Sequence, residues 1–197
     1  ATGVNTVDVE AARRLGITVS NVPEYGTDSV AQFVMSQVLY FAHRVALHDQ
    51  RVRDGAWGKI NQFCFWDTPQ VELAGLTFGI IGYGRIGKTV AKLANAFGMK
   101  VLAYSPSGPK QDQVAKPAPL ETIFKDADII SLHCVLNSNT RHLINASALS
   151  KMKSTAYLIN TARGSLIDEV ALAQALTHRV IAGAALDVVP EEPIPQD

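Results

Sequence analysis

The feature that most constrains this chain is a glycine-rich run placed between an apolar segment and a helical pattern. The run GYGRIG at residues 82–87 follows a strand-like segment over 78–82 and opens a helix-like segment over 86–97. In that setting Gly82 permits a tight turn, Gly84 lets a phosphate approach the backbone, and Gly87 lets the helix pack on the strand. The free N–H groups and the positive end of the helix then attract a pyrophosphate. The run predicts a dinucleotide site, and the alternative is a glycine-rich turn that binds nothing.

Strand-like and helix-like segments alternate after the glycine run. The pattern predicts strands over 100–104, 128–133, 156–161 and 180–187, with helices over 120–125, 146–152 and 168–178 between them. A polar loop is expected over 105–119. This alternation is typical of an α/β, Rossmann-type fold, in which helices cover both faces of a doubly wound parallel sheet.

The segment before the glycine run predicts a short helix over 8–15, a strand over 17–22, a long helix and an aromatic-rich loop over 55–69. Thr27 or Asp28 is expected to cap the long helix, which continues to about Asp49. Its apolar residues cover more than one stripe, so several of its faces should be buried. Two explanations remain open, a central core helix or a helix shared with a second subunit in a two-fold homodimer.

Composition excludes several classes of protein. The 197 residues carry 18 basic and 18 acidic side chains, and no run of Lys or Arg indicates a nucleic-acid surface. The most apolar stretch, 29–47, contains too many polar residues for a membrane span. Cys64 and Cys134 show no metal-ligand spacing, so we expect no metal site, no disulfide framework and a cytoplasmic location.

The strand over 100–104 ends at Ser105, where a carboxylate normally binds the adenosine ribose hydroxyls. Without that carboxylate a 2′-phosphate is not repelled, and Ser105, Ser107 and Lys110 are candidates to contact it. No Arg is present to select the phosphate. The residues therefore leave the choice between NAD and NADP open.

Two later segments, 158–169 and 184–193, end predicted parallel strands, where ligands bind in open α/β sheets. An Arg in this position, such as Arg163, can grip a carboxylate with two hydrogen bonds and polarise a neighbouring carbonyl. A Glu beside a His can hold the imidazole ready for acid–base work. The structural alternatives are a surface salt bridge for Arg163 and a solvated loop for Glu191 and Glu192.

Together these motifs resemble the D-isomer-specific 2-hydroxyacid dehydrogenases over essentially the whole chain. The resemblance is carried by GYGRIG, by SLHC at 131–134 with TRHLIN at 140–145, by NTARGSLIDE at 160–169 and by ALDVVPEEP at 185–193. FCFWD at 63–67 and ELAG at 72–75 are similar to the glycerate dehydrogenase (hydroxypyruvate reductase) branch, which is mostly NADH-linked.

The resemblance implies an oxidoreductase for a small 2-oxo or 2-hydroxy acid of the hydroxypyruvate/glycerate or glyoxylate class. NAD is the expected cofactor, with NADP as the alternative. A second reading is a non-catalytic NAD(H)-sensing scaffold, similar to corepressor members of the family.

The resemblance also implies roles for individual residues. Arg163 would bind the substrate carboxylate and polarise its carbonyl, and Glu192 would be the carboxylate of a His–Glu pair. Thr2 and Gly3 would offer backbone N–H groups to the substrate. The implied cofactor-binding residues are Gly82, Gly84, Arg85, Ile86 and Gly87 at the pyrophosphate, Ser105 near the adenosine ribose, and Cys134, Thr161, Ala162 and Asp187 around the nicotinamide.

The resemblance further implies how the family fold is divided. Residues 1–25 are expected to be a remnant of the substrate domain and 26–197 the dinucleotide-binding domain, without the C-terminal end of the family fold. The family's catalytic His follows the Glu-Pro dipeptide at a position that would lie beyond Asp197, and none of the five His residues of this sequence lies in that motif. We therefore expect little or no turnover from these 197 residues alone.

Overall fold

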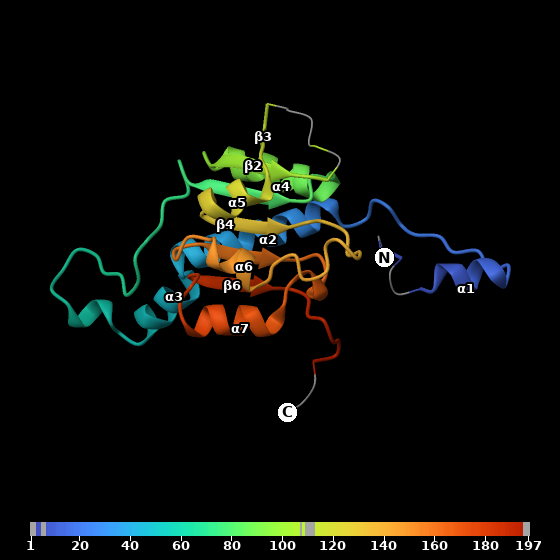
Figure 1. The fold of residues 1–197 in the computed structure, drawn as a ribbon. Helices are drawn as coiled ribbons and strands as arrows, with labels where there is room; N and C mark the ends of the chain where they lie inside the picture. The colour runs from blue at the N-terminus through green and yellow to red at the C-terminus, as the bar shows by residue number, and fades with distance from the viewer. Residues whose placement is uncertain (1–2, 5–6, 107, 109–112, 195–197) are drawn as a thin grey trace.

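A six-stranded parallel sheet forms the centre of the molecule (Figure 1). The structure is a computed structural model that describes residues 3–4, 7–106, 108 and 113–194. The strand order is β3-β2-β1-β4-β5-β6, which is the doubly wound order with its reversal between β1 and β4. The expected Rossmann-type fold is confirmed. The strands are β1 (Thr77–Ile81), β2 (Lys100–Tyr104), β3 (Lys116–Pro117), β4 (Ile129–Leu132), β5 (Tyr157–Asn160) and β6 (Gly183–Leu186).

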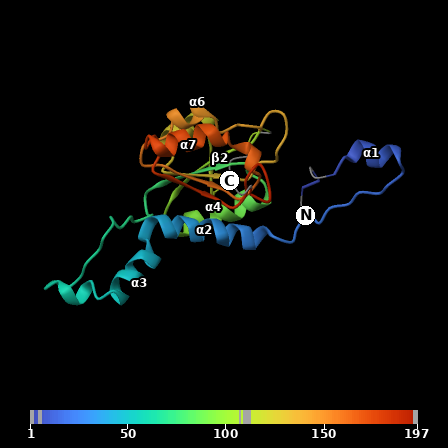
Figure 2. The ribbon, with the colours of Figure 1, turned by 90° about the horizontal axis from the view of Figure 1, so that it is seen from below.

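Helices cover both faces of this sheet, as Figure 2 shows. One face packs against α2 (Thr27–His43) and α4 (Arg85–Ala96), whose buried side chains share a core with Phe78 and Ile80 of β1. The other face packs against a second layer of helices, and Ile81 belongs to that core. The second layer consists of α5 (Leu120–Asp126), α6 (Ala146–Ser150) and α7 (Glu169–Thr177).

Local side-chain caps explain where several helices begin. Asp8 accepts a hydrogen bond from the Ala11 N–H at the start of α1 (Val9–Arg14). Asn145 and Asp168 do the same for α6 and α7, at 3.0 and 3.1 Å. Each cap satisfies an N–H group that the first turn leaves without a helical partner.

The expected strand over 17–22 is wrong. Ile17 and Val22 are more than half exposed, and neither lies beside another strand. Alternating apolar residues form a strand only where a partner strand accepts their backbone hydrogen bonds. This segment instead connects α1, which lies away from the sheet in both views, to α2 (Figures 1 and 2).

The long helix also differs from the prediction. It begins after Gly26, which makes no side-chain cap, so neither Thr27 nor Asp28 is the capping residue. It ends at His43. The next residue, Arg44, has a left-handed φ of 47°, and α3 (Val45–Arg53) follows in a new direction. The helical periodicity was real on both sides of Arg44, but a single residue in the left-handed region redirects the chain.

Two smaller differences concern the sheet. The expected loop over 105–119 contains the short edge strand β3, and the last strand covers only Gly183–Leu186 of the expected 180–187. Among the described helices, none combines the length and apolar character needed to cross a bilayer.

The chain between α2 and β1 forms an arm that extends from the sheet (Figure 2). The arm contains α3 and a 3-10 helix, η1 (Trp57–Lys59), and α3 buries none of its residues. Four aromatic residues lie on it, with Trp57 near Phe65. The arm is therefore poorly covered by the rest of its own chain.

Gly79 gives a test of the packing between β1 and α5. A Cβ at Gly79 would lie 2.6 Å from Ile123 Cγ2 and 3.0 Å from Ala127 Cβ, so Gly79→Ala should overpack this core. We expect a loss of about 1–3 kcal/mol in the free energy of unfolding, measured by urea denaturation. Gly58→Ala is the matched control, because its Cβ would meet nothing within 4 Å. Equal stability of the two variants would contradict this packing.

Candidate active site

The carboxyl ends of the strands gather the segments that the sequence singled out. Gly82 follows β1, His133 and Cys134 follow β4, and Thr161 and Asp187 follow β5 and β6. The strand order reverses between β1 and β4, and in doubly wound sheets the ligand crevice lies outside the carboxyl ends of the strands at this reversal. A ligand at the crevice would contact loops from both halves of the sheet.

The glycine run is shaped by two very close backbone approaches. Gly82 has a φ of 104°, and a Cβ there would lie 2.4 Å from Cys134 N. A Cβ on Gly87 would lie 2.2 Å from the Gly82 carbonyl oxygen. Gly84 differs, because a Cβ there would meet nothing within 4 Å. Backbone packing within the protein thus requires glycine at positions 82 and 87. At Gly84 no protein atom lies nearby, which leaves an open face beside the first turn of α4.

The residues after the glycines point in different directions. Ile86 packs against the core shared by α2 and α4. The Arg85 guanidinium turns away from the sheet, where it donates to the Pro23 carbonyl at 2.9 Å and lies 3.5 Å from the Glu24 carboxylate. The structure therefore brings Gly82, Gly84, Gly87 and Ile86 together and directs Arg85 toward the segment before α2.

Ser105 lies at the expected place at the end of β2. It is half-buried, and its carbonyl accepts a hydrogen bond from the Gly108 N–H at 2.9 Å. Ser107 and Lys110, the other candidates for a 2′-phosphate, lie outside the described residues. The described part of this loop presents a hydroxyl where an acidic side chain is usual.

The turn after β5 is held by Asn160, a residue whose role the sequence analysis missed. Its fully buried side chain donates to the Arg163 carbonyl at 2.9 Å and accepts from the Ala162 N–H at 3.0 Å. Arg163 in turn donates to the Ala162 carbonyl at 2.7 Å. A polar residue at the end of an otherwise apolar strand was the signal that could have identified Asn160.

The Thr161 hydroxyl in the same turn is buried and has no hydrogen-bond partner within the described part of the chain. A buried hydroxyl without a partner costs free energy, about 1–3 kcal/mol. A polar ligand group at this edge of the sheet would satisfy it. Together with the open face of Gly84, this hydroxyl shows that the residues present fit a dinucleotide.

Arg163 and Glu192 lie on segments that touch. A Cβ on Gly164 would lie 2.0 Å from the carbonyl carbon of Val189, so the loop after β6 rests directly on the turn that carries Arg163. The Asp187 N–H donates to the Asn160 carbonyl at 3.0 Å and aligns the two strand ends. The exposed Glu192 carboxylate accepts from the Val189 N–H at 3.1 Å.

The two expected substrate contacts at the N-terminus are only partly visible. Gly3 is half-buried, and Thr2 lies outside the described residues.

His133 and Cys134 carry shifted pKa values at the crevice. Burial lowers the pKa of His133 to about 4, so the imidazole is neutral at pH 7, and its Nε2 lies 2.9 Å from the hydroxyl of the fully buried Ser131. Burial raises the pKa of Cys134 to about 11, opposed by a backbone hydrogen bond. Cys134 is therefore a thiol rather than a thiolate nucleophile at pH 7.

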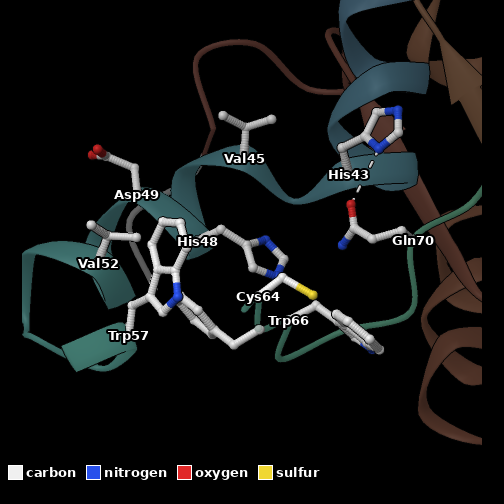
Figure 3. A pocket seen from close by; sticks show the side chains of 10 residues that line it. His43, Val45, His48, Asp49, Val52, Trp57, Cys64, Trp66 and Gln70 are labelled. Carbon is white, nitrogen blue, oxygen red and sulfur yellow. Dashed lines mark hydrogen bonds between the residues drawn. The ribbon is translucent and has the colours of Figure 1, made fainter. Parts of the chain in front are cut away.

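Within the described residues, no three His, Cys, Asp or Glu side chains are grouped to hold a metal ion. A cavity of about 630 Å³ lies away from the crevice, in the arm (Figure 3). His43, whose Nδ1 lies 3.2 Å from Gln70 Oε1, lines it together with Cys64 and Trp66. Its lining is mainly apolar and aromatic, so it does not share the polar character of the strand ends.

Comparison with known proteins identifies a family. The model described as "D-isomer specific 2-hydroxyacid dehydrogenase, NAD binding domain" matches residues 35–197. A glycerate dehydrogenase from Methylorubrum extorquens is 46% identical over 100% of this chain and 61% of its own length. A hydroxypyruvate reductase from Blautia hydrogenotrophica is 43% identical over 100% of this chain and 62% of its own.

A solved structure shares the fold as well. An acyclic imino acid reductase (Bsp5) in complex with NADPH and D-Arg superimposes with a TM-score of 0.87 and 34% identity. The match covers 99% of this chain and 62% of that one. The chain thus spans about three fifths of the length of the relatives it matches.

The lowered pKa of His133 predicts a pH dependence of stability. Its pKa is about 4 in the folded protein against 6.5 as the ordinary value, so the unfolded chain binds an extra proton between these limits. Stability should therefore fall as the pH falls from 6.5 toward 4, by at most about 1.4 kcal/mol per pH unit. Urea denaturation at several pH values should show a shallower slope for His133→Gln than for the wild type. His178→Gln, at an exposed position, should keep the wild-type slope; equal slopes for all three proteins would refute the prediction.

Proposed function

Because the chain belongs to the D-isomer-specific 2-hydroxyacid dehydrogenase family, we propose that its protein is an oxidoreductase acting on a small 2-oxo or 2-hydroxy acid. The substrate class is hydroxypyruvate/glycerate or glyoxylate, and the cofactor is NAD, with NADP as the alternative. The observation that carries the proposal is the crevice between β1 and β4, where Gly84 leaves an open face and Thr161 leaves a buried hydroxyl without a partner in the described residues.

We assign the cofactor-holding residues from their positions in the family motifs, and the positions of the loops support the assignment. The first turn of α4, with Gly82, Gly84 and Gly87, is assigned to the pyrophosphate, since its N–H groups and helix dipole favour an anion. Ser105 is assigned to the adenosine ribose. When bound, the nicotinamide supplies or accepts the hydride. We assign Cys134, Thr161, Ala162 and Asp187 to the nicotinamide end, and Arg85 and Ile86 to the pyrophosphate.

Arg163 is assigned to the substrate carboxylate. It is half-buried in a turn that Asn160 holds rigid, at the same strand edge as the crevice. A guanidinium can bind a carboxylate with two parallel hydrogen bonds and polarise the adjacent carbonyl. Thr2 and Gly3 are assigned to the same carboxylate through their backbone N–H groups. Glu192, on the loop that rests against Gly164, is assigned to orient a His.

Arg163 and Glu192 also favour an enzyme over the alternative of an NAD(H)-sensing scaffold, because a sensor needs neither side chain. We assign residues 1–25 to a substrate domain and 26–197 to the dinucleotide-binding domain. The position of α1 away from the sheet supports this division (Figures 1 and 2). A cytoplasmic location is proposed from the two cysteines, both of which are free.

We further assign a two-fold homodimer to the arm and to the outer face of α2. One face of α2 packs on the core, while Phe33 and Tyr40 on it remain 40% and 48% exposed. On the arm, Phe63 is 94% and Trp66 62% exposed. Large exposed aromatic side chains gathered on one arm favour a protein interface.

The dimer is tested by light scattering of the wild type and two variants. Trp66→Ser should raise the dimer dissociation constant at least tenfold, because exposed aromatic residues anchor interfaces. Val170→Ser is the control, since Val170 is 68% exposed on α7, a helix on the opposite face of the sheet from α2 (Figure 2). A wild-type monomer well above micromolar concentration would eliminate the dimer.

The cofactor assignment is tested by fluorescence titration of the chain with NADH and, in parallel, with NADPH. Gly84→Ala should lower the affinity at least tenfold without lowering the unfolding temperature, because the new methyl meets only the space assigned to the phosphates. Gly58→Ala should bind like the wild type. Tighter binding of NADPH than of NADH would move the assignment to an NADP-linked reductase. Binding of neither dinucleotide would overturn the proposed cofactor site.

A further inference from the structure

Arg85 occupies an electrostatically unfavourable place in its own helix. It is the first residue of α4, and the positive end of the helix dipole disfavours a cation there. The same end favours an anion. A cation in this position is therefore best explained by an anion that it helps to bind, rather than by the stability of α4.

In the structure that anion is provided by the protein. The Arg85 Nη1 lies 3.5 Å from Glu24 Oε1, and Nη2 donates to the Pro23 carbonyl at 2.9 Å. Both partners lie on the segment that leads into α2, far from Arg85 in the sequence. The two side chains are 56% and 64% exposed, so the pair is solvent-screened and easily exchanged.

The surroundings leave room for that exchange. Glu24 and Arg85 line a polar cavity of about 510 Å³ between the start of α2 and the first turn of α4. Asp28 lines the same cavity without an ion pair to Arg85 among the described residues. Glu24 can therefore leave the guanidinium without displacing packed side chains.

We propose that Glu24 competes with the dinucleotide pyrophosphate for Arg85 and so sets the affinity of the cofactor site. This rests on the proposed function, which assigns the first turn of α4 to the pyrophosphate. The pyrophosphate carries more negative charge than one carboxylate and also meets the free N–H groups of the helix, so it wins the exchange. Breaking the pair with Glu24 is a cost that every binding event includes.

Removing the competing charge should therefore tighten binding. In an NADH titration at low salt, Glu24→Gln should lower the dissociation constant by roughly 1.4- to 5-fold, the range set by an exposed ion pair. Asp28→Asn is the matched control, because it removes the same charge from the same cavity without touching the pair; it should leave the dissociation constant unchanged. Raising the salt concentration should shrink the effect of Glu24→Gln.

The double variant Glu24→Gln/Arg85→Gln shows whether the effect passes through Arg85. It should bind NADH no more tightly than Arg85→Gln alone. The proposal is overturned if Glu24→Gln binds no more tightly than the wild type, if Asp28→Asn gains as much, or if the gain persists without Arg85. Failure of the proposed function gives a different result, in which the wild type binds neither NADH nor ADP-ribose, and the proposal for Glu24 then falls with it.

Discussion

The architecture depends on one close contact between two backbone segments, the turn after β1 and the turn after β4. No side chain other than hydrogen fits at Gly82, because Cys134 N would lie 2.4 Å from its Cβ. The contact lies just beyond the paired ends of β1 and β4, where the connections of these strands diverge to opposite halves of the sheet. The crevice expected at this point is therefore a consequence of the topology. Because residue 82 is a glycine, backbone atoms rather than a side chain lie at its base. Polar backbone groups at the floor are what a dinucleotide needs.

Buried polar side chains extend this rigidity to the neighbouring strand ends. The Asn160 side chain hydrogen-bonds to the Arg163 carbonyl and to the Ala162 N–H in the turn that carries Arg163. At the end of β4, the Ser131 hydroxyl hydrogen-bonds to the neutral imidazole of His133. Such groups are tolerated in a core only when they have partners, and their partners then fix the loops that follow. The Thr161 hydroxyl departs from this rule within the described residues, and it lies in the turn assigned to the nicotinamide. The Thr68 hydroxyl on the arm is also buried without a partner in the described residues, so the Thr161 hydroxyl supports the assignment only together with its place at a strand end.

The parts of the fold that sequence could predict are those set by local pattern. The glycine run and the alternation of strand-like and helix-like segments can be recognised from residues that are close together in the sequence. They predicted the parallel sheet and the ends of most of its strands. The strand expected over 17–22 failed because pairing requires a partner that a local pattern cannot supply. The prediction of one helix continuing to about Asp49 was wrong for a similar reason. The residues on both sides of Arg44 have a helical pattern, so the pattern does not reveal the break between α2 and α3. Asn160 was overlooked because its role depends on contacts across a turn.

Arg85 shows how a binding site behaves before its ligand arrives. A helix N-terminus with an added guanidinium concentrates positive charge, and a folded chain lowers that cost with whatever anion lies nearest. Here that anion is Glu24, on the segment that connects α1 to α2. The affinity of the site then depends on what must be displaced as well as on what is gained. The same contact joins the glycine-rich turn to that connecting segment. The charge at the assigned cofactor site and the position of the segment before α2 therefore both depend on Arg85.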